Sequence, residues 1–485
     1  MSGFKRLLKN SLSNIINGFS NVILGIVISP VLLHNLSKVD FSIWSLTIQV
    51  GVLIGIFGIG LQVTVGRFVA LHLNNQQKLQ KTMHQSLFFV LLLSLVCMGG
   101  IFFLAKFFFS FFPEVSETST NAKHILILIG GSFVINNMFS PFVGYFTGIE
   151  RNDITAGINI LFKVILGTSI LLLVHHGLEV IAWIYFAINT FNQLAFYILY
   201  KLKNRTQKIK LSLDKNLFRT IVVFFSGLLV WNIAQFLISG IGTFIVGKYS
   251  FQEFAGFAVL MTLVNAGVGI LGAMINPIIQ PMIRMHNLEN NHHVELLVNK
   301  LIFIFSMIVF IGVFIAWFAS VYILGVWLGY QQATNLHIMF SLLLTAYLIR
   351  MIAAPYGLML VAYGKQLSIA WLPVLEGVLN FALSIFFVRI YGAIGIAYST
   401  FISGVLIMAV YACKYQAEAE YKSKLIFISF LIIPMMIAIC LISLVMTQSE
   451  IIHCVIYGIQ VAFIIVFIIF LIKQVKSIKN LLNQY

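Results

Sequence analysis

The chain has 485 residues, of which 60% are hydrophobic and 9% are charged, and its 30 Lys and Arg exceed its 14 Asp and Glu. Soluble domains are about 45–50% apolar and about 25% charged, so this composition excludes an ordinary soluble protein, a disulfide scaffold, a nucleic-acid binder and an enzyme with a large soluble catalytic domain. Apolar runs of about 20 residues recur along the chain, and each can cross roughly 30 Å of hydrocarbon. We therefore expect an all-α polytopic membrane protein.

Hydropathy predicts fourteen membrane-spanning helices joined by short loops. No small-residue cleavage site follows the basic N-terminal stretch, so the first apolar run is interpreted as a retained helix and not a signal peptide. The longest polar stretch, residues 201–219, is too short to form an extramembrane domain. In chain order the predicted spans are 12–33, 41–71, 83–112, 123–148, 153–175, 179–201, 218–247, 252–283, 297–325, 334–362, 366–389, 393–414, 423–446 and 451–473.

The distribution of cations predicts the orientation of the chain. With a cytoplasmic N-terminus, 23 of the 30 Lys and Arg fall on the cytoplasmic side, two lie inside spans, and five lie near the outer face. Lys and Arg accumulate in cytoplasmic loops, so both termini are expected to be cytoplasmic. The basic clusters are expected to lie beside anionic lipid, and they require no nucleic-acid partner. The five outer cations are Lys38, Lys106, Lys123, Lys248 and Arg389.

Signatures of soluble enzymes and of cofactor sites are missing from the sequence. The four cysteines have no disulfide or metal-ligand spacing. His175-His176 and His292-His293 lack the i, i+4 arrangement of a helical metal site, and the chain has no phosphate-binding glycine loop. We therefore predict no catalytic residue, no metal and no cofactor.

An internal duplication with an offset of 213–215 residues runs through the first twelve predicted spans. An even number of crossings separates the copies, so the two six-helix repeats enter the membrane from the same side and are predicted to enclose a central cavity. The predicted parts are residues 1–214, residues 215–416, and residues 417–485, which hold two added helices and a basic tail. The matches are Ser37-x2-Asp40-Phe41 with Ser250-x2-Glu253-Phe254, Pro141-Phe142 with Pro355-Tyr356, and His176-Gly177-x3-Ile181-Ala182 with Tyr391-Gly392-x3-Ile396-Ala397.

Five predicted helices, in both halves of the chain, carry rows of polar side chains. At about 100° per residue, the asparagines of the first helix fall within roughly 60° of arc, so the row must face protein or water and not lipid. The fifth helix repeats the pattern. Hydrogen bonds between helices and the lining of a wet cavity are both compatible with such rows. The rows are Asn10, Asn14, Asn17 and Asn21 on the first helix, Asn152, Thr155, Asn159 and Lys163 on the fifth, Asn232, Gln235 and Ser239 on the seventh, Thr262, Asn265, Gly269, Gly272, Asn276 and Gln280 on the eighth, and Glu376, Asn380 and Ser384 on the eleventh.

Three ionisable residues, Lys163, Arg350 and Glu376, are predicted to lie deep inside spans. Each costs about 2.5–3.5 kcal/mol at the bilayer centre before pairing or hydration. Glu376 and Arg350 could form a buried ion pair, or the cations could draw an anionic headgroup into a cleft while Glu376 balances or gates them. Arg67 and Arg284, at cytoplasmic helix ends, could extend to the interface or guard the way in for a phosphate.

Several motifs, in this order, resemble the polysaccharide-transporter flippases, the Wzx-type O-antigen translocases of the multidrug/oligosaccharidyl-lipid/polysaccharide exporter superfamily. Ser42 stands where that family usually has Gly. The motifs follow a basic N-terminus and an Asn-rich first helix, and they are Pro30-x3-His34-x-Leu36, Asp40-Phe41-x2-Trp44, Gly58-Ile59-Gly60-Leu61 with Arg67, and Gly148-x2-Arg151-Asn152.

The resemblance implies a flippase of the cell inner membrane that carries an undecaprenyl-pyrophosphate-linked oligosaccharide, such as an O-antigen unit for lipopolysaccharide, from the cytoplasmic to the outer leaflet by alternating access. It also implies other assembly proteins, such as a polymerase and a chain-length regulator, as partners. Our hypothesis assigns Lys163 and Arg350 to the headgroup charge, and the asparagines of the first and fifth helices to the sugars. The candidate substrate-binding residues are Lys163, Arg350, Asn14, Asn17, Asn21, Asn159, Arg67 and Arg284, with Glu376 as a coupling or ion-pair residue.

Three alternatives belong to other classes. A drug or cation antiporter of the same superfamily would need acidic groups in its cavity, where only Glu376 stands against two deep cations. A membrane glycan polymerase or ligase would need a large outer loop that bears catalytic residues. A scaffold without transport would not need polar rows in both halves.

Overall fold

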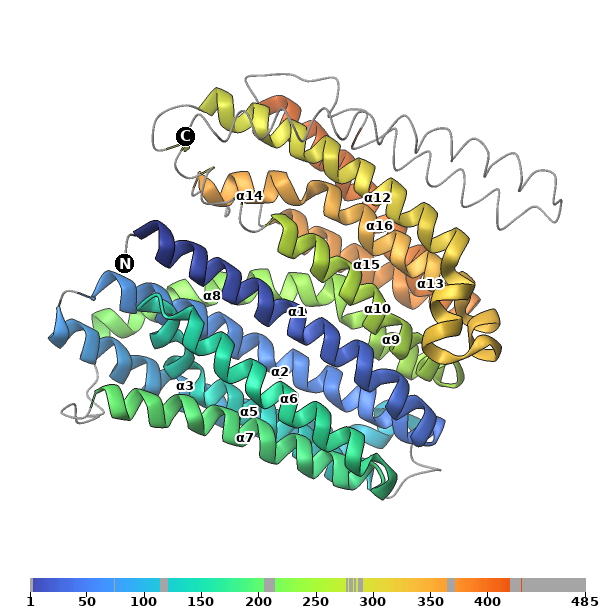
Figure 1. Cartoon of the computed structure of the whole chain (residues 1–485), viewed down its shortest axis with the longest axis horizontal. Helices are drawn as coiled ribbons and strands as arrows, with labels where there is room; N and C mark the ends of the chain where they lie inside the picture. Colours follow the sequence, from blue (N-terminus) through green and yellow to red (C-terminus); the bar gives the residue numbers. More distant parts are fainter. Residues whose placement is uncertain are drawn as a thin grey trace. The chain divides into compact units, whose positions relative to one another are not determined.

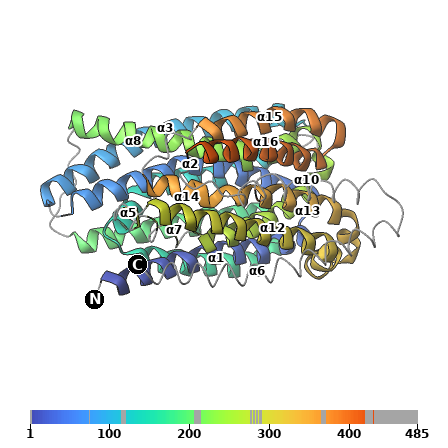
Figure 2. The same ribbon diagram turned by 90° about the horizontal axis from the view of Figure 1, so that it is seen from above.

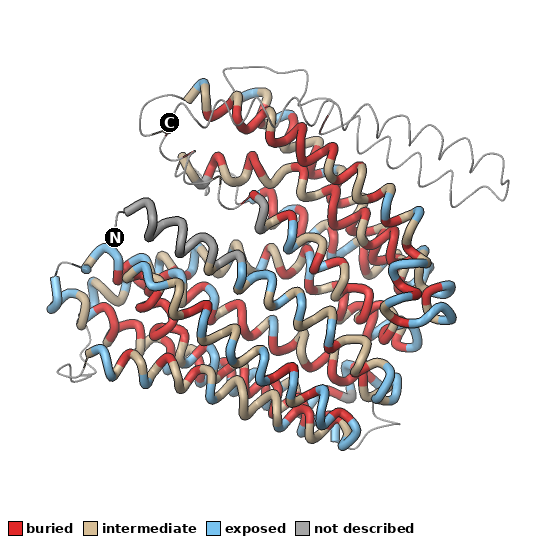
Figure 3. Tube along the Cα trace, in the orientation of Figure 1, coloured by how far each residue is buried: buried red, intermediate tan, exposed pale blue. Residues whose placement is uncertain are grey.

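The computed structural model confirms an all-α polytopic membrane fold. Within the described ranges every regular element is helical, and eleven of these helices are long and apolar enough to cross a membrane. Burial alternates along the helices, with buried positions where neighbouring helices meet (Figure 3). The thirteenth and fourteenth predicted spans lie outside the described residues. The structure describes residues 3–73, 75–113, 121–204, 214–275, 278, 282, 285–286, 291–363, 371–418 and 429.

The chain divides into two compact units, Met1–Thr262 and Leu263–Tyr485. The helices of the first unit are α1 (Gly3–Asn35), α2 (Lys38–Leu71), α3 (Gln76–Phe111), α5 (Ala122–Gly148), α6 (Asn152–Leu173), the short 3-10 helix η1 (Val174–His176), α7 (Leu178–Lys203), α8 (Lys215–Ser239) and α9 (Ile241–Tyr249). The boundary between the two units falls inside α10 (Phe251–Ile275). The second unit also contains α12 (Asn291–Leu328), α13 (Tyr330–Arg350), η3 (Met351–Ala353), α14 (Ala354–Ala362), α15 (Trp371–Tyr391) and α16 (Ile394–Glu418).

Each of the first twelve predicted spans overlaps a helix of the structure, but two of them are broken. The span predicted over residues 218–247 ends at Ser239, and α9 begins after Gly240. Gln49 of α2 donates a hydrogen bond from Nε2 to the carbonyl oxygen of Gly240 at 3.1 Å. A side chain from another helix therefore bonds a backbone carbonyl at the break, which hydropathy alone does not reveal.

The span predicted over residues 334–362 is also divided. The α-helix stops at Arg350, a 3-10 turn covers Met351–Ala353, and α14 continues from Ala354. Pro355 follows this turn. Proline has no backbone N–H and clashes with the preceding turn, so it fits the start of a helix and not the interior of one. The sequence contained this signal, and the uniform hydropathy of the span concealed it.

In the first unit, α2 packs against α5, and glycines let the two helices approach closely. A methyl group added at Gly144 would lie 2.8 Å from both the carbonyl oxygen of Gln62 and Cβ of Val65, and one at Gly148 would lie 2.6 Å from the carbonyl oxygen of Gly66. Small residues four apart let membrane helices pack backbone to backbone. This α2–α5 contact is the centre of the unit.

The other helices of the first unit pack around that centre. The α1 helix runs beside α6 in both views, and α6 also packs against α7 (Figure 1, Figure 2). On another side, α8 packs against α2 and α3. Two aromatic contacts support the latter packing, because Phe225 and Phe218 of α8 each meet the ring of Phe89 of α3 at centroid distances of 5.1 and 5.8 Å. The α1–α6–α7 layer carries most of the polar residues discussed below.

The second unit has its own apolar core. It is built mainly from α12, α13, α14 and α16, and it includes Phe305, Ile349, Tyr356 and Met408, each at most 3% exposed. The aromatic rings of Tyr356 and Tyr415 meet edge to face with centroids 4.9 Å apart. The α15 helix packs on α16.

Two of the matched repeat segments have the same local structure. Gly177 precedes α7 with φ +93°, and Gly392 precedes α16 with φ +64°, a backbone conformation that favours glycine. The Ile-Ala pair that follows each glycine is buried in both copies, with Ile181, Ala182 and Ile396 at 0% exposure. The matched Ser37 caps the start of α2, since the amide of Asp40 donates to Ser37 Oγ at 3.0 Å.

The predicted boundary between the repeats, at residues 214 and 215, stays a prediction. It describes the duplication of the sequence, whereas the division at Thr262 describes packing. The two differ because α8 and α9 contact α2. The Phe225 ring, for example, lies 3.1 Å from where a Cβ of Gly60 would stand.

Replacing Gly144 by Ala is expected to destabilise the protein by about 1–3 kcal/mol, because the added methyl group overpacks a backbone-to-backbone contact. The matched control is Gly157→Ala on α6, where the added methyl meets nothing within 4 Å. Thermal unfolding of the purified protein in detergent measures both changes. Equal midpoints for the two variants would show that α2 and α5 do not depend on this contact.

Candidate functional site

Lys163 lies in the middle of α6, and α1 holds its ammonium group. Nζ donates to Oδ1 of Asn17 at 2.7 Å, to Oγ of Ser20 at 2.9 Å and to the backbone oxygen of Asn17 at 3.1 Å. An ammonium group has three N–H donors, so all three have acceptors. Ser20 in turn donates from Oγ to the backbone oxygen of Asn17 at 2.7 Å. We call Lys163, Asn17 and Ser20 the Lys163 cluster.

Within the described residues, neutral oxygens solvate the charge of Lys163 and no carboxylate balances it. Lys163 is half-buried, and none of the ion pairs in the described ranges includes it. Ionisable groups inside membrane spans usually pair with each other or face water or a substrate pathway. A half-buried cation without a counter-ion is therefore available to an anion that reaches the cluster.

Asn159, one helical turn before Lys163, bonds in another direction. Its Oδ1 accepts a hydrogen bond from Nδ2 of Asn192 on α7 at 3.3 Å. Further along α7, Gln193 donates from Nε2 to Oδ1 of Asn136 on α5 at 2.7 Å. The polar residues of α6 and α7 thus form hydrogen bonds between helices.

Of the predicted asparagine row on α1, one member contacts Lys163 in the described structure. The structure brings Asn17 to Lys163, whereas Asn21, one turn further along α1, is exposed. The side chain of Asn14 lies outside the described residues. Asn17 supports both interpretations of the row. It forms a hydrogen bond to another helix, and its partner there is Lys163, a cation without a carboxylate partner in the described residues.

In the second unit, Arg350 and Glu376 form a buried ion pair. Nε of Arg350 on α13 lies 2.5 Å from Oε1 of Glu376 on α15, and their side chains are 16% and 7% exposed. The stem of Arg350 passes Gly404 of α16, where a Cβ would lie 3.0 Å from Cγ of the arginine. Of the two alternatives for Glu376, the structure contains the ion pair.

The polar residues that follow Glu376 on α15 are buried against α16. Asn380 accepts at Oδ1 from Thr400 at 3.3 Å and from Ser403 at 3.4 Å. Ser384 and Ser399 share a hydrogen bond of 2.7 Å. This row joins two helices within the unit, because each of its members has a polar partner on the helix that covers it. Its hydrogen bonds match the interpretation of the polar rows as contacts between helices.

The two cytoplasmic arginines have different outcomes. Arg67 is exposed at the end of α2, and its guanidinium carbon lies 4.4 Å from the ring centroid of Phe224 on α8. A cation over an aromatic face is stabilised there while its polar edge remains available. Arg284 lies outside the described residues.

Sequence reasoning missed two residues that the structure places with the polar groups. Ser20 carries no signal by itself, although its position three residues after Asn17 put it on the same helical face. Glu295 falls between two predicted spans, but α12 begins at Asn291 and buries Glu295 to 6% exposure. One turn further along α12, Asn299 accepts a hydrogen bond from the hydroxyl of Tyr415 at 2.8 Å.

Apolar spanning helices that hold charged residues define a multi-pass membrane protein with polar sites at the depth of the bilayer. The chain belongs to the family described as polysaccharide biosynthesis protein, whose family model matches residues 7–286. The family resemblance predicted from the motifs is therefore confirmed. No curated protein sequence matches the chain.

Solved structures of the MOP superfamily share the fold. The lipid II flippase MurJ in an inward closed conformation is 13% identical, covers 94% of this chain and 98% of its own, and has a TM-score of 0.68. An inward-facing multidrug resistance MATE family transporter is 15% identical, covers 84% and 95%, and has a TM-score of 0.61. A MOP superfamily transporter from Pyrococcus furiosus is 13% identical, covers 90% and 96%, and has a TM-score of 0.52. At these identities the likeness establishes the fold.

Removing either partner of the Arg350–Glu376 pair is expected to destabilise the protein by about 3–5 kcal/mol, because the remaining charge is buried without compensation. Arg350→Met and Glu376→Gln test each side. The double variant should be more stable than the sum of the two losses predicts, since no charge remains to be compensated. Thermal unfolding in detergent measures all three, with the exposed Lys106→Gln as a control; strictly additive losses would contradict the pairing.

Proposed function

We propose that the chain is a flippase that carries an undecaprenyl-pyrophosphate-linked oligosaccharide, an O-antigen or similar repeat unit, from the cytoplasmic to the outer leaflet. Membership of the polysaccharide biosynthesis family supports the substrate class. The fold shared with a lipid II flippase supports the type of transport. Movement of the two predicted six-helix repeats against each other would open the site to each side in turn. In this proposal the protein is a transporter and not an enzyme.

One observation carries the proposal: the ammonium group of Lys163 is held by neutral oxygens inside a span and has no carboxylate partner in the described residues. A pyrophosphate and its sugars cannot cross hydrocarbon without replacement hydrogen bonds and counter-charge. Hydrogen bonds from a cation to phosphate oxygens are among the strongest in proteins. The Lys163 cluster offers such a cation at the depth where the headgroup must pass.

The remaining candidates receive distinct roles in this proposal. Asn14, Asn17, Asn21 and Asn159 would offer amide groups to sugar hydroxyls beside Lys163. Arg350 would contribute charge only by exchanging Glu376 for the headgroup, which makes that ion pair a gate. Arg67 and Arg284 would meet the phosphate at the cytoplasmic side.

The proposed orientation follows from the bias of Lys and Arg toward one side of the membrane. Both termini would face the cytoplasm, and the protein would lie in the cell inner membrane. A polymerase and a chain-length regulator would then act on the repeat units that it delivers.

A cation or drug antiporter is a second candidate, favoured by the fold shared with MATE transporters and by buried Glu295. An antiporter would depend on an acidic group that titrates during transport. Glu376 is already occupied by Arg350. Loss of drug resistance in Glu295→Gln, with surface glycan unchanged in Lys163→Ala, would select the antiporter.

Replacing Lys163 by Ala is expected to abolish surface glycan at normal protein abundance, because the headgroup loses its cation. A second variant, Asn17→Asp, distinguishes a loss of the free charge of Lys163 from a loss of folding. The new carboxylate would pair with Lys163, so stability should be kept or raised while transport falls at least tenfold. Glycan blots and protein abundance, measured together in cells that depend on this gene, provide the readout.

Lys163→Arg and Lys106→Ala are the controls. The arginine keeps the charge and should retain part of the transport, and exposed Lys106 should be dispensable. Unchanged glycan in Lys163→Ala would remove Lys163 from the site. Full transport by Asn17→Asp would show that the charge of Lys163 is not what the substrate uses.

A further inference from the structure

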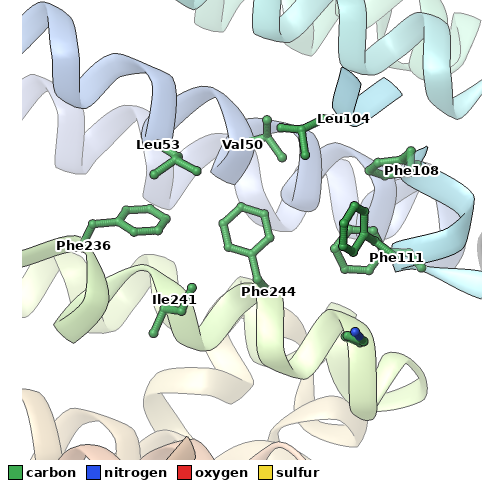
Figure 4. Close-up of a pocket in the computed structure, with 10 residues that line it drawn as sticks. Val50, Leu53, Leu104, Phe108, Phe111, Phe236, Ile241 and Phe244 are labelled. Carbon is green, nitrogen blue, oxygen red and sulfur yellow. The ribbon is translucent and has the colours of Figure 1, made fainter. Parts of the chain in front are cut away.

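A second site lies away from the Lys163 cluster, between α2 and α3 on one side and α8 and α9 on the other (Figure 4). It is a partly enclosed cavity of about 270 Å³ within the first unit. Leu53 of α2 and Phe236 of α8 lie toward one end, while Phe108 of α3 lies toward the other (Figure 4). Nine of its ten lining residues are apolar, and the tenth is Lys248.

The break between α8 and α9 shapes this cavity. Phe236 lies before Gly240 and Phe244 lies after it, and both rings line the cavity with centroids 6.1 Å apart. The hydrogen bond from Gln49 to the carbonyl oxygen of Gly240 holds α2 to the break. A Cβ at position 240 would lie 2.6 Å from the Phe236 ring. The cavity is therefore a consequence of specific contacts and not of loose packing.

Its length suits one hydrocarbon chain. The lining on α8 and α9 extends from Phe236 to Lys248, which is about 18 Å at 1.5 Å per residue. Half the thickness of a hydrocarbon core is about 15 Å. An apolar slot of this length, with its charged residue at one end, matches a lipid tail that enters from a single leaflet.

Lys248 supplies the polar end of the slot. Its Nζ lies 6.0 Å from the ring centroid of Phe111 and 5.6 Å from that of Tyr249, at the end of α9. No Asp or Glu of the described chain is within ion-pair distance of it, so its charge is balanced only by aromatic faces. This end of the bundle favours a headgroup with net negative charge over a zwitterionic one.

We propose that this cavity binds one acyl chain of an anionic phospholipid of the phosphatidylglycerol class, with the phosphate on Lys248. The apolar lining receives the tail, and the ammonium group donates to the phosphate oxygens. The bound lipid fills the space beside the α8–α9 break and ties α9 to α3. This site is independent of the transported substrate and of the orientation of the chain in the membrane.

The test uses the full-length protein in nanodiscs of phosphatidylglycerol and phosphatidylethanolamine with matched chains, doped with a phosphatidylglycerol that carries a photoreactive tail. Labelled peptides are mapped by mass spectrometry. Labelling is expected on α3 and α9 around Phe108 and Phe244. Lys248→Gln should lower it about fivefold, the effect of one interfacial cation on an anionic lipid, and Lys248→Arg should restore it.

Two further variants separate the slot from the general lipid surface. Leu53→Trp fills the cavity and should remove the label even with Lys248 intact, whereas Leu95→Trp, at a 71% exposed position on α3, should not. Labelling spread evenly over the lipid-facing helices, or insensitive to both Lys248→Gln and Leu53→Trp, would overturn the proposal. Complete displacement of the label by an equal amount of a polyprenyl phosphate would also overturn it, because the slot would then prefer the tail of the carried lipid.

Discussion

The structure depends on how it holds charge in a medium that does not solvate it. A charged side chain in the hydrocarbon region must find an opposite charge, polar groups or water, or the span that carries it does not insert stably. The two units solve this problem differently. In the first, Lys163 keeps its charge and is surrounded by neutral oxygens of Asn17 and Ser20. In the second, Arg350 and Glu376 cancel each other. Only the first arrangement leaves a net charge for a ligand.

The predicted duplication places the two charged groups, Lys163 and Glu376, at related positions. Lys163 of α6 and Glu376 of α15 are 213 residues apart, within the offset that relates the two repeats, so ionisable residues of opposite sign occupy nearly equivalent positions. Glu376 is neutralised by Arg350 from another helix of its own unit, whereas Lys163 receives only hydrogen bonds from the described residues. In the predicted duplication, the two repeats therefore differ at this position: one carries a carboxylate paired with an arginine, and the other carries a lysine held by hydrogen bonds.

Hydropathy located the first twelve spans because the cost of exposing backbone and charge to lipid acts on whole segments. Local features depend on single contacts, and those were not predictable. At the break between α8 and α9, the carbonyl oxygen of Gly240 accepts a hydrogen bond from Gln49, a residue 191 positions away. The burial of Glu295 follows from a helix that starts earlier than its apolar stretch. The partnership of Arg350 and Glu376 could be anticipated as one alternative, since deep charges need compensation, but the choice required the geometry.

The motifs that carry the family resemblance belong largely to the scaffold. Gly58 leaves room for the amide oxygen of Asn137, and Gly148 admits the backbone of Gly66. Arg151 pairs with Asp153 beside it through bonds of 2.9 and 3.2 Å. None of these residues contacts the Lys163 cluster through a hydrogen bond or ion pair in the described structure. The residues that indicate the family therefore largely allow α2 and α5 to pack. Residues that indicate the substrate are to be sought among those that packing does not require. Neither a lysine at position 163 nor an asparagine at position 17 is needed to join two helices in a bilayer, so the charge that they place there calls for a functional explanation.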